Sequence, residues 1–530
     1  MKNYIIPSMF KLNFFNIKSL FLICFSIFNL FLYFSSIYKI NHLPLYFTIF
    51  FTLSFLTVFL SIRHKSFFFE KFFSTYMWLA YSFFYCIHVI YFDEIYTFGI
   101  GSFDLQSTAN HKELFSVLIV FNIAFLVSMF CSRKIFNIEY NSLNFKLNNY
   151  LEKNNYILLL SLIFIILIIG LLNINFKIID YYYFAEIKNH PMVDALLKWI
   201  FLFGFSSIFC IFLNLDTSKK LITNLFLISS LQEALFYFSI LSRGCIFNSL
   251  AFLFALISKP LLKKKFSFIS FFLLISFISF VFIFNFYILL LERSGGNKLN
   301  FEKYRNTTYI KEHRTNFKNT TDDNLLKNFQ SLRFVSASFD LNLAKKINFI
   351  DDLKGLAKGQ KPKDFNAKVE TLKMAFKNRI FGMDTLMVVV GSSKNSFSFF
   401  KESLREKFNP GQLSFFDKLR QGQDFNINKS AVNITLPSIL PFLYYTDSLS
   451  FVFISVFIII LIFNSLERFN IYLNNNIFLS ALISQLIAYR LWHFGYTPAN
   501  SYKFLMALLI SIFLHFIVQN ILVRIKILVK

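Results

Sequence analysis

Long apolar stretches, separated by short polar segments, fill most of this 530-residue chain. A helix that crosses the hydrocarbon core of a bilayer takes about 20 mainly apolar residues, and the stretches have this length. They are too long and too uniformly apolar for the strands of a membrane barrel. The pattern therefore predicts an all-α polytopic membrane protein with about twelve transmembrane helices. We place these helices at residues 19–38, 43–62, 72–92, 114–131, 155–173, 197–215, 221–241, 245–262, 266–291, 448–466, 477–494 and 503–523.

One long hydrophilic insert interrupts the apolar pattern between the ninth and the tenth predicted helix. It divides the chain into a membrane region at 1–291, a loop domain at 292–447 and a second membrane region at 448–530. Loops of this length usually carry function, so we expect a working part here. Apolar residues at helical spacing predict that the insert is mainly helical. The predicted helices of the insert are Asp323–Ile347, Asn366–Ile380 and Asn395–Phe408.

The charge pattern adds an orientation to this picture. The net charge is +25, but the basic residues are spread over the loops and form no nucleic-acid-binding motif. We therefore exclude nucleic acid as a partner. Lys and Arg are concentrated in alternate short loops, which predicts cytoplasmic termini and an insert on the outer, periplasmic side of a bacterial inner membrane.

Several kinds of site are missing from the sequence. The five cysteines all lie in or at the ends of apolar stretches and include no CxxC pair, so neither a disulfide framework nor a zinc site is predicted. The chain also contains no P-loop, HExxH, GxSxG or GxGxxG motif and no Asp-x-Asp. An ATP-driven machine and a nucleotide-sugar transferase are both disfavoured, and we expect no metal and no cofactor.

Ser242-Arg243-Gly244 is the sharpest local signal for chemistry. It lies at the predicted outer end of the seventh helix, on the same side as the insert. The guanidinium of Arg243 offers a fork of donors that matches phosphate oxygens, and the glycine lets a ligand approach closely. The alternative is an interfacial arginine that extends to lipid headgroups.

Three other polar residues lie in or at the ends of predicted helices. Glu233 is deep in the seventh helix, where an ionisable group is a functional candidate by default. A buried structural carboxylate is an equal alternative. Arg490 and His493 share one face at the predicted outer end of the eleventh helix. His493 could act as a general base or bind a phosphate, whereas the alternative is a basic and aromatic belt at the membrane interface.

Three segments carry a resemblance to a known family: Phe238–Gly244, Arg379–Val388 and Leu436–Tyr445. Their order, together with one large outer loop before the last helices, resembles the bacterial O-antigen or oligosaccharide repeat-unit polymerases of the Wzy type, which are relatives of the O-antigen ligases. The resemblance covers roughly residues 200–470. The chain departs from the family at Asp447 and Ser448, where a glycine-rich turn is usual.

The resemblance implies a metal-independent glycosyltransferase that polymerises undecaprenyl-diphosphate-linked oligosaccharides at the outer face of the inner membrane. Its partners would be the lipid bilayer, these lipid-linked oligosaccharides, a chain-length regulator and a flippase. Arginines would then stabilise the charge of the diphosphate leaving group. The candidate catalytic residues are Arg243, Arg379 and His493. The candidate substrate-binding residues are Arg293, Arg490, Glu233, Tyr444 and Tyr445.

Three alternatives stay open. A ligase that moves a finished glycan would use the same chemistry. A transporter or flippase of lipid-linked oligosaccharide would suit twelve helices, but such proteins show matching halves and polar groups near the midplane, and this chain shows no matching halves. A non-catalytic membrane scaffold is the third alternative, and it should tolerate the loss of Arg243.

Overall fold

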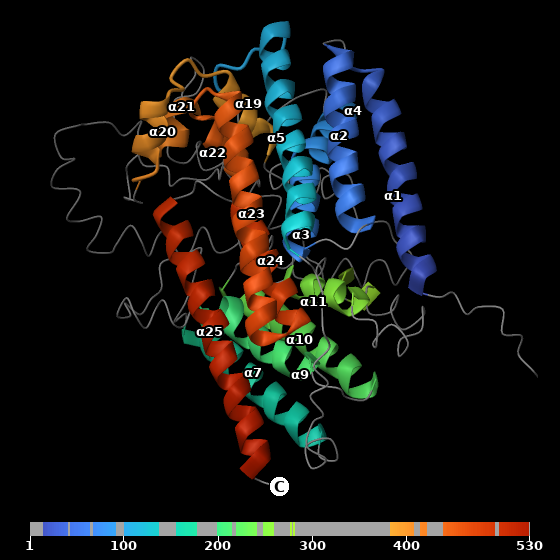
Figure 1. Ribbon diagram of the computed structural model, residues 1–530, viewed down its shortest axis with the longest axis vertical. Coiled ribbons are helices and arrows are strands. Elements are labelled where there is room, and N and C mark those ends of the chain that lie inside the picture. Colours follow the sequence, from blue (N-terminus) through green and yellow to red (C-terminus); the bar gives the residue numbers. More distant parts are fainter. Residues whose placement is uncertain are drawn as a thin grey trace, which may run out of the picture.

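All regular structure in the described part of this chain is helical (Figure 1). In these residues there is no β-strand, so the predicted all-α fold is confirmed for them. The computed structural model describes residues 14–40, 43–63, 67–91, 100–136, 155–176, 199–214, 219–240, 247–258, 276–277, 279–280, 382–406, 414–420, 438–492 and 498–528.

Observed helices overlap the predicted apolar stretches, except for 266–291, which lies largely outside the described residues. The number of twelve transmembrane helices stays a prediction. Among the described residues, four segments are long and apolar enough to cross a membrane: Pro44–Arg63, Thr108–Ile135, Leu449–Asn474 and Phe504–Ile521. The helices before the insert are α1 (Phe14–Ile37), α2 (Pro44–Arg63), α3 (Phe68–Met77), η1 (Trp78–Phe83), α4 (Phe84–Tyr91), α5 (Thr108–Ile135), α7 (Asn155–Phe176), η2 (Ile200–Gly204), α9 (Phe205–Asn214), α10 (Lys219–Ile240) and α11 (Phe247–Ser258). The remaining helices are α19 (Met383–Val390), α20 (Phe397–Ser403), α21 (Phe415–Arg420), α22 (Ile439–Tyr444), α23 (Leu449–Asn474), α24 (Ile477–Trp492) and α25 (Pro498–Leu528).

The third and sixth predicted helices are not regular. A segment of π-helix, η1, lies between α3 and α4, and a second one, η2, directly precedes α9. A π turn holds one extra residue, and the apolar pattern does not reveal it. The third predicted helix therefore corresponds to α3, η1 and α4, which follow one another without a break.

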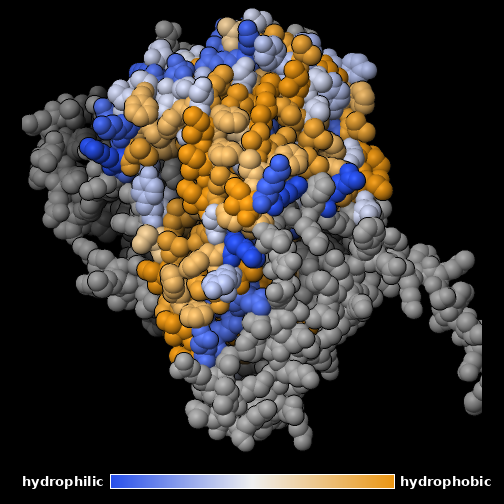
Figure 2. Space-filling model, in the orientation of Figure 1, coloured by the Kyte–Doolittle hydropathy of each residue, from blue (hydrophilic) through white to orange (hydrophobic). Residues whose placement is uncertain are grey.

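The helices pack into a bundle with apolar surfaces. α1, α2, α5 and α23 run side by side, α24 packs on α3 and α11, and α7 packs on α10 (Figure 1). The core between α2 and α5 is aromatic; the rings of Phe50 and Phe115 stack with centroids 5.9 Å apart. Apolar side chains cover much of the helical face seen in Figure 2, and hydrophilic ones gather at its upper end. The exposed apolar side chains of α23 include Ile454, Ile458 and Ile462, as expected for helices in contact with lipid.

The N-terminus of α3 is capped by a distant helix. The Phe67 side chain makes no cap, although the first amides of a helix have no intrahelical partner. The backbone amides of Phe68 and Phe69 each donate to a different carboxylate oxygen of Glu467 in α23, both at 2.9 Å. Ser484 of α24 donates to the same carboxylate at 2.8 Å. The negative carboxylate also lies at the positive end of the α3 dipole.

A second polar contact joins the same helices. The side-chain nitrogen of Asn464 in α23 donates to Glu70 of α3 and to Ser132 of α5, each at 2.8 Å. All three side chains are buried. These hydrogen bonds fix α23 against α3 and α5, so the last part of the chain completes the packing of the first.

The end of the insert forms a small helical cap on the bundle. Here α19, α20, α21 and α22 gather beside the upper ends of α5 and α23 (Figure 1). The predicted helix Asn395–Phe408 is confirmed in part as α20, where the Ser396 side chain accepts from the Phe399 amide at 3.2 Å. The predicted helices at Asp323–Ile347 and Asn366–Ile380 lie outside the described residues. We call the region formed by α19 to α22 the loop end.

Candidate functional site at the loop end

The helix α19 is pressed against the backbone of the bundle at both of its ends. A Cβ atom at Gly382 would lie 2.5 Å from the carbonyl oxygen of Ala80, in η1. At Gly391 it would lie 2.3 Å from the backbone nitrogen of Phe103. Every residue of α19 between the two glycines is buried. The insert therefore returns to the membrane region through a rigid, tightly fitted element.

The π turn η1 meets two segments of the insert at this point. The hydroxyl groups of Tyr81 and Ser438 are hydrogen bonded, which joins η1 to the start of α22. Asp384 of α19 lies close enough to Tyr81 to interact electrostatically, and its Oδ1 accepts from the Gly382 amide at 3.2 Å. Turns of π-helix occur frequently at functional sites. Here the turn presents a polar hydroxyl where α19 and α22 meet.

Tyr444 and Tyr445 close the site from the side of α22. The Tyr444 hydroxyl donates to Oε1 of Glu113 in α5 at 2.5 Å. Burial and the adjacent Glu113 carboxylate raise the pKa of the Tyr444 phenol. The backbone oxygen of Tyr445 accepts from the Ser396 amide at 2.8 Å, and its ring packs edge-on against Phe399 with centroids 5.2 Å apart. Both tyrosines thus hold the loop end together.

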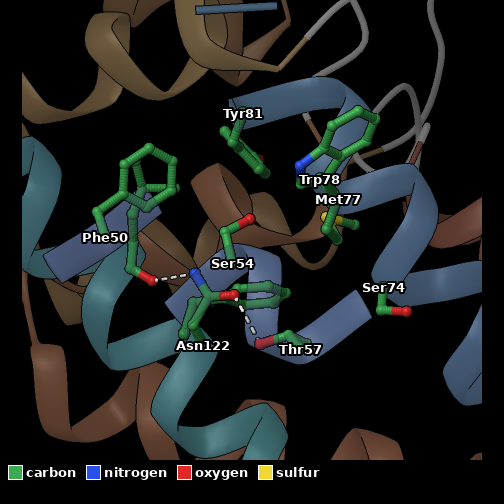
Figure 3. A pocket seen from close by; sticks show the side chains of 10 residues that line it. Phe50, Ser54, Thr57, Ser74, Met77, Trp78, Tyr81 and Asn122 are labelled. Atoms are coloured by element: carbon green, nitrogen blue, oxygen red, sulfur yellow. Dashed lines mark hydrogen bonds between the residues drawn. The ribbon is translucent and has the colours of Figure 1, made fainter. Parts of the chain in front are cut away.

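A small polar cavity lies inside the bundle next to η1 (Figure 3). It has room for about one water molecule, ≈ 10 Å³, and Tyr81 and Trp78 line it. Within it, Thr57 donates to Asn122 Oδ1 at 3.1 Å, which joins α2 to α5. A sugar or a diphosphate does not fit such a space. The cavity is therefore a packing feature of the polar contact between α2, α5 and η1.

The other sequence candidates do not come together in the described residues. Arg490, in α24, has its guanidinium carbon 5.8 Å from the ring centroid of Phe504. Glu233 is buried in α10, where Oε2 accepts from the backbone amide of Ser249 at 2.9 Å. Neither belongs to the loop end. Four further candidates lie outside the described residues: Arg243, Arg293, Arg379 and His493.

Sequence reasoning missed three polar residues that join the loop end to the bundle: Tyr81, Glu113 and Ser438. Tyr81 and Glu113 lie in apolar helices, 357 and 331 residues before their partners Ser438 and Tyr444, so nothing local links them to the insert. Ser438 is part of the segment Leu436–Tyr445, but its role as a partner of Tyr81 depends on the fold. In the described residues, no three His, Cys, Asp or Glu side chains gather in a way that would hold a metal ion.

Comparisons with protein-family models, with curated proteins and with solved structures each found no match to this chain.

Proposed function

We propose that this chain is a membrane glycosyltransferase that polymerises polyprenyl-diphosphate-linked oligosaccharide repeat units at the outer face of a bacterial inner membrane. One observation carries the proposal: the described parts of two of the three family-like segments, in α19 and α22, pack against each other. They meet on η1 and α5, at one end of the bundle. Segments far apart in sequence that converge in this way are expected when they serve one site.

The reaction needs two kinds of group at this end. A hydroxyl of the acceptor sugar attacks the anomeric carbon of the donor, a new glycosidic bond forms, and the lipid diphosphate leaves. Arginines can neutralise the charge that develops on the diphosphate. Arg379 precedes Gly382, the residue before α19, by only three residues, so the two are close along the chain. Glu113 is a half-buried carboxylate at the same end and can accept the hydroxyl proton.

Replacement of the two arginines tests the proposal. We expect Arg379→Ala and Arg243→Ala to lower polymerisation by about 100-fold or more, as loss of a charge-stabilising hydrogen-bond donor does in other enzymes. The measurement is the length ladder of the surface glycan on a gel, in the native host, with the amount of protein in the membrane checked. Arg405→Ala is the matched control, because Arg405 is an exposed arginine of the same insert.

The pattern of products separates the alternatives. Lipid capped by a single repeat, without a ladder, supports the polymerase. A normal ladder in both variants contradicts it and favours a transporter or a scaffold. Loss of even the single repeat points to a flippase or a ligase instead. Arg379→Lys adds a further check, since lysine keeps the charge but loses the two-pronged hydrogen bonding to phosphate.

A further inference from the structure

A buried polar cluster lies between α9, α10 and α11, away from the loop end. Its members come from three helices, and all are at most 3% exposed. We call this set the α10 cluster, and it consists of Ser206, Cys210, Ser229, Gln232, Glu233, Asn248 and Ser249. The rest of this region is apolar; Phe209, Phe236 and Phe252 are fully buried. So many polar side chains in an apolar bundle require an explanation, because burial of a polar group without a partner is costly.

The Glu233 carboxylate is held on one side only. Its Oε2 accepts from both the backbone amide and the hydroxyl of Ser249, in the first turn of α11. Burial opposes a negative charge on this carboxylate, whereas these two donors and the positive end of the α11 dipole favour it, so a bound cation would stabilise the ionised form. Oε1 is buried without a hydrogen-bond partner. Among the residues that the structure describes, no Lys or Arg pairs with this group.

Other unpartnered polar atoms lie on the same helix. The Ser229 hydroxyl and both polar atoms of the Gln232 side chain are buried without a hydrogen-bond partner. Ser229 precedes Glu233 by one helical turn, so the two share a face, and they lie close enough to interact. Native proteins leave few such atoms unsatisfied, and each one suggests an ion or a bound water.

The unpartnered polar atoms and the single carboxylate of the α10 cluster indicate which kind of ligand it would bind. The unpartnered atoms of Glu233 and Ser229, on one face of α10, are oxygens, which suits a hard cation such as Na⁺ rather than a transition metal. One carboxylate balances one positive charge, so a divalent ion is a poor fit. We propose that the α10 cluster binds a single monovalent cation, with Glu233 as its charged ligand and the hydroxyl of Ser229 as a neutral one. This inference is independent of the function proposed for the loop end.

The purified full-length chain in detergent tests the inference. We expect saturable binding of about one ²²Na⁺ per chain, competed by NaCl but not by choline chloride. Glu233→Gln should weaken this binding at least tenfold, and Ser229→Ala should weaken it less. Na⁺ should also raise the apparent melting temperature by roughly 2 °C at ten times its dissociation constant. Glu467→Gln is the control, since Glu467 is a buried carboxylate with three hydrogen-bond donors, and it should retain Na⁺ binding.

Each other outcome overturns the inference. If the wild-type chain does not bind ²²Na⁺, the cluster holds water or a proton. If folded Glu233→Gln binds Na⁺ as the wild type does, the site lies elsewhere. Should Glu233→Gln fail to fold, Ser229→Ala decides the question, and unchanged affinity in that variant rejects the site.

Discussion

The cap on α3 allows a quantitative prediction for Glu467→Gln. The two carboxylate oxygens each accept from one amide, of Phe68 and of Phe69, at 2.9 Å. A glutamine has one acceptor oxygen, so in either orientation one amide faces an NH₂ group. A hydrogen bond to a charged group contributes about 1.5–3 kcal/mol, and a buried donor left unsatisfied costs about 1–3 kcal/mol. These two figures are alternative estimates of the same lost hydrogen bond and are not added together. The loss of the charge at the positive end of the helix dipole adds about 0.3–1 kcal/mol. We therefore expect the variant to lose about 2–4 kcal/mol of stability.

Two measurements check this value. Thermal unfolding in detergent gives the global loss, and hydrogen exchange of the peptide that contains Phe68 and Phe69 gives the local one. The control is Glu402→Gln, an exposed glutamate in α20, which should change stability by less than about 0.5 kcal/mol. If Glu467→Gln melts within about 1 °C of the wild type and its α3 amides stay equally protected, the carboxylate does not cap α3.

Two more predictions concern the loop end. Gly391→Ala should cost about 1–3 kcal/mol, because the new Cβ would lie 2.3 Å from the Phe103 backbone nitrogen; limited proteolysis should then cut the insert faster than in Ser393→Ala, and equal rates would contradict the tight fit. Tyr444→Phe should cost about 1–2 kcal/mol by loss of the hydrogen bond to Glu113. Because the pKa of Tyr444 is raised in the fold, its contribution is present below about pH 10 and is lost as the pH rises further. The stability difference between the wild type and Tyr444→Phe should therefore shrink between about pH 9 and pH 11, because the phenol of the unfolded chain ionises in this range. A constant difference would refute this.

The local pattern of apolar residues predicted the long helices well, because helix formation in lipid depends mainly on the length of an apolar run. Long apolar runs must be helical in lipid, and the observed helices overlap these runs in the described residues. By contrast, α19 was not predicted. Its run of three valines at Val388–Val390 favours a strand by propensity, and its helix depends on packing against Ala80 and Phe103.

The candidate site was less accessible to prediction than the fold. Tyr444 was selected from its segment, but its partner Glu113 is 331 residues away. The contact between Tyr81 and Ser438 spans 357 residues. Contacts of this kind depend on which helices pack together, and the spacing of apolar residues along one helix does not show this. The roles of Arg243 and Arg379 stay predictions.

The remote cap on α3 also has a consequence for how the protein is made. Phe68 and Glu467 are 399 residues apart, so at about 5–20 residues per second the cap arrives roughly 20–80 s after the helix it serves. During that interval two amides of α3 lack their final acceptor, and the faces of α3 and α5 that contact α23 lack their partner. A chain that ends before α23 therefore keeps these groups without their final partners.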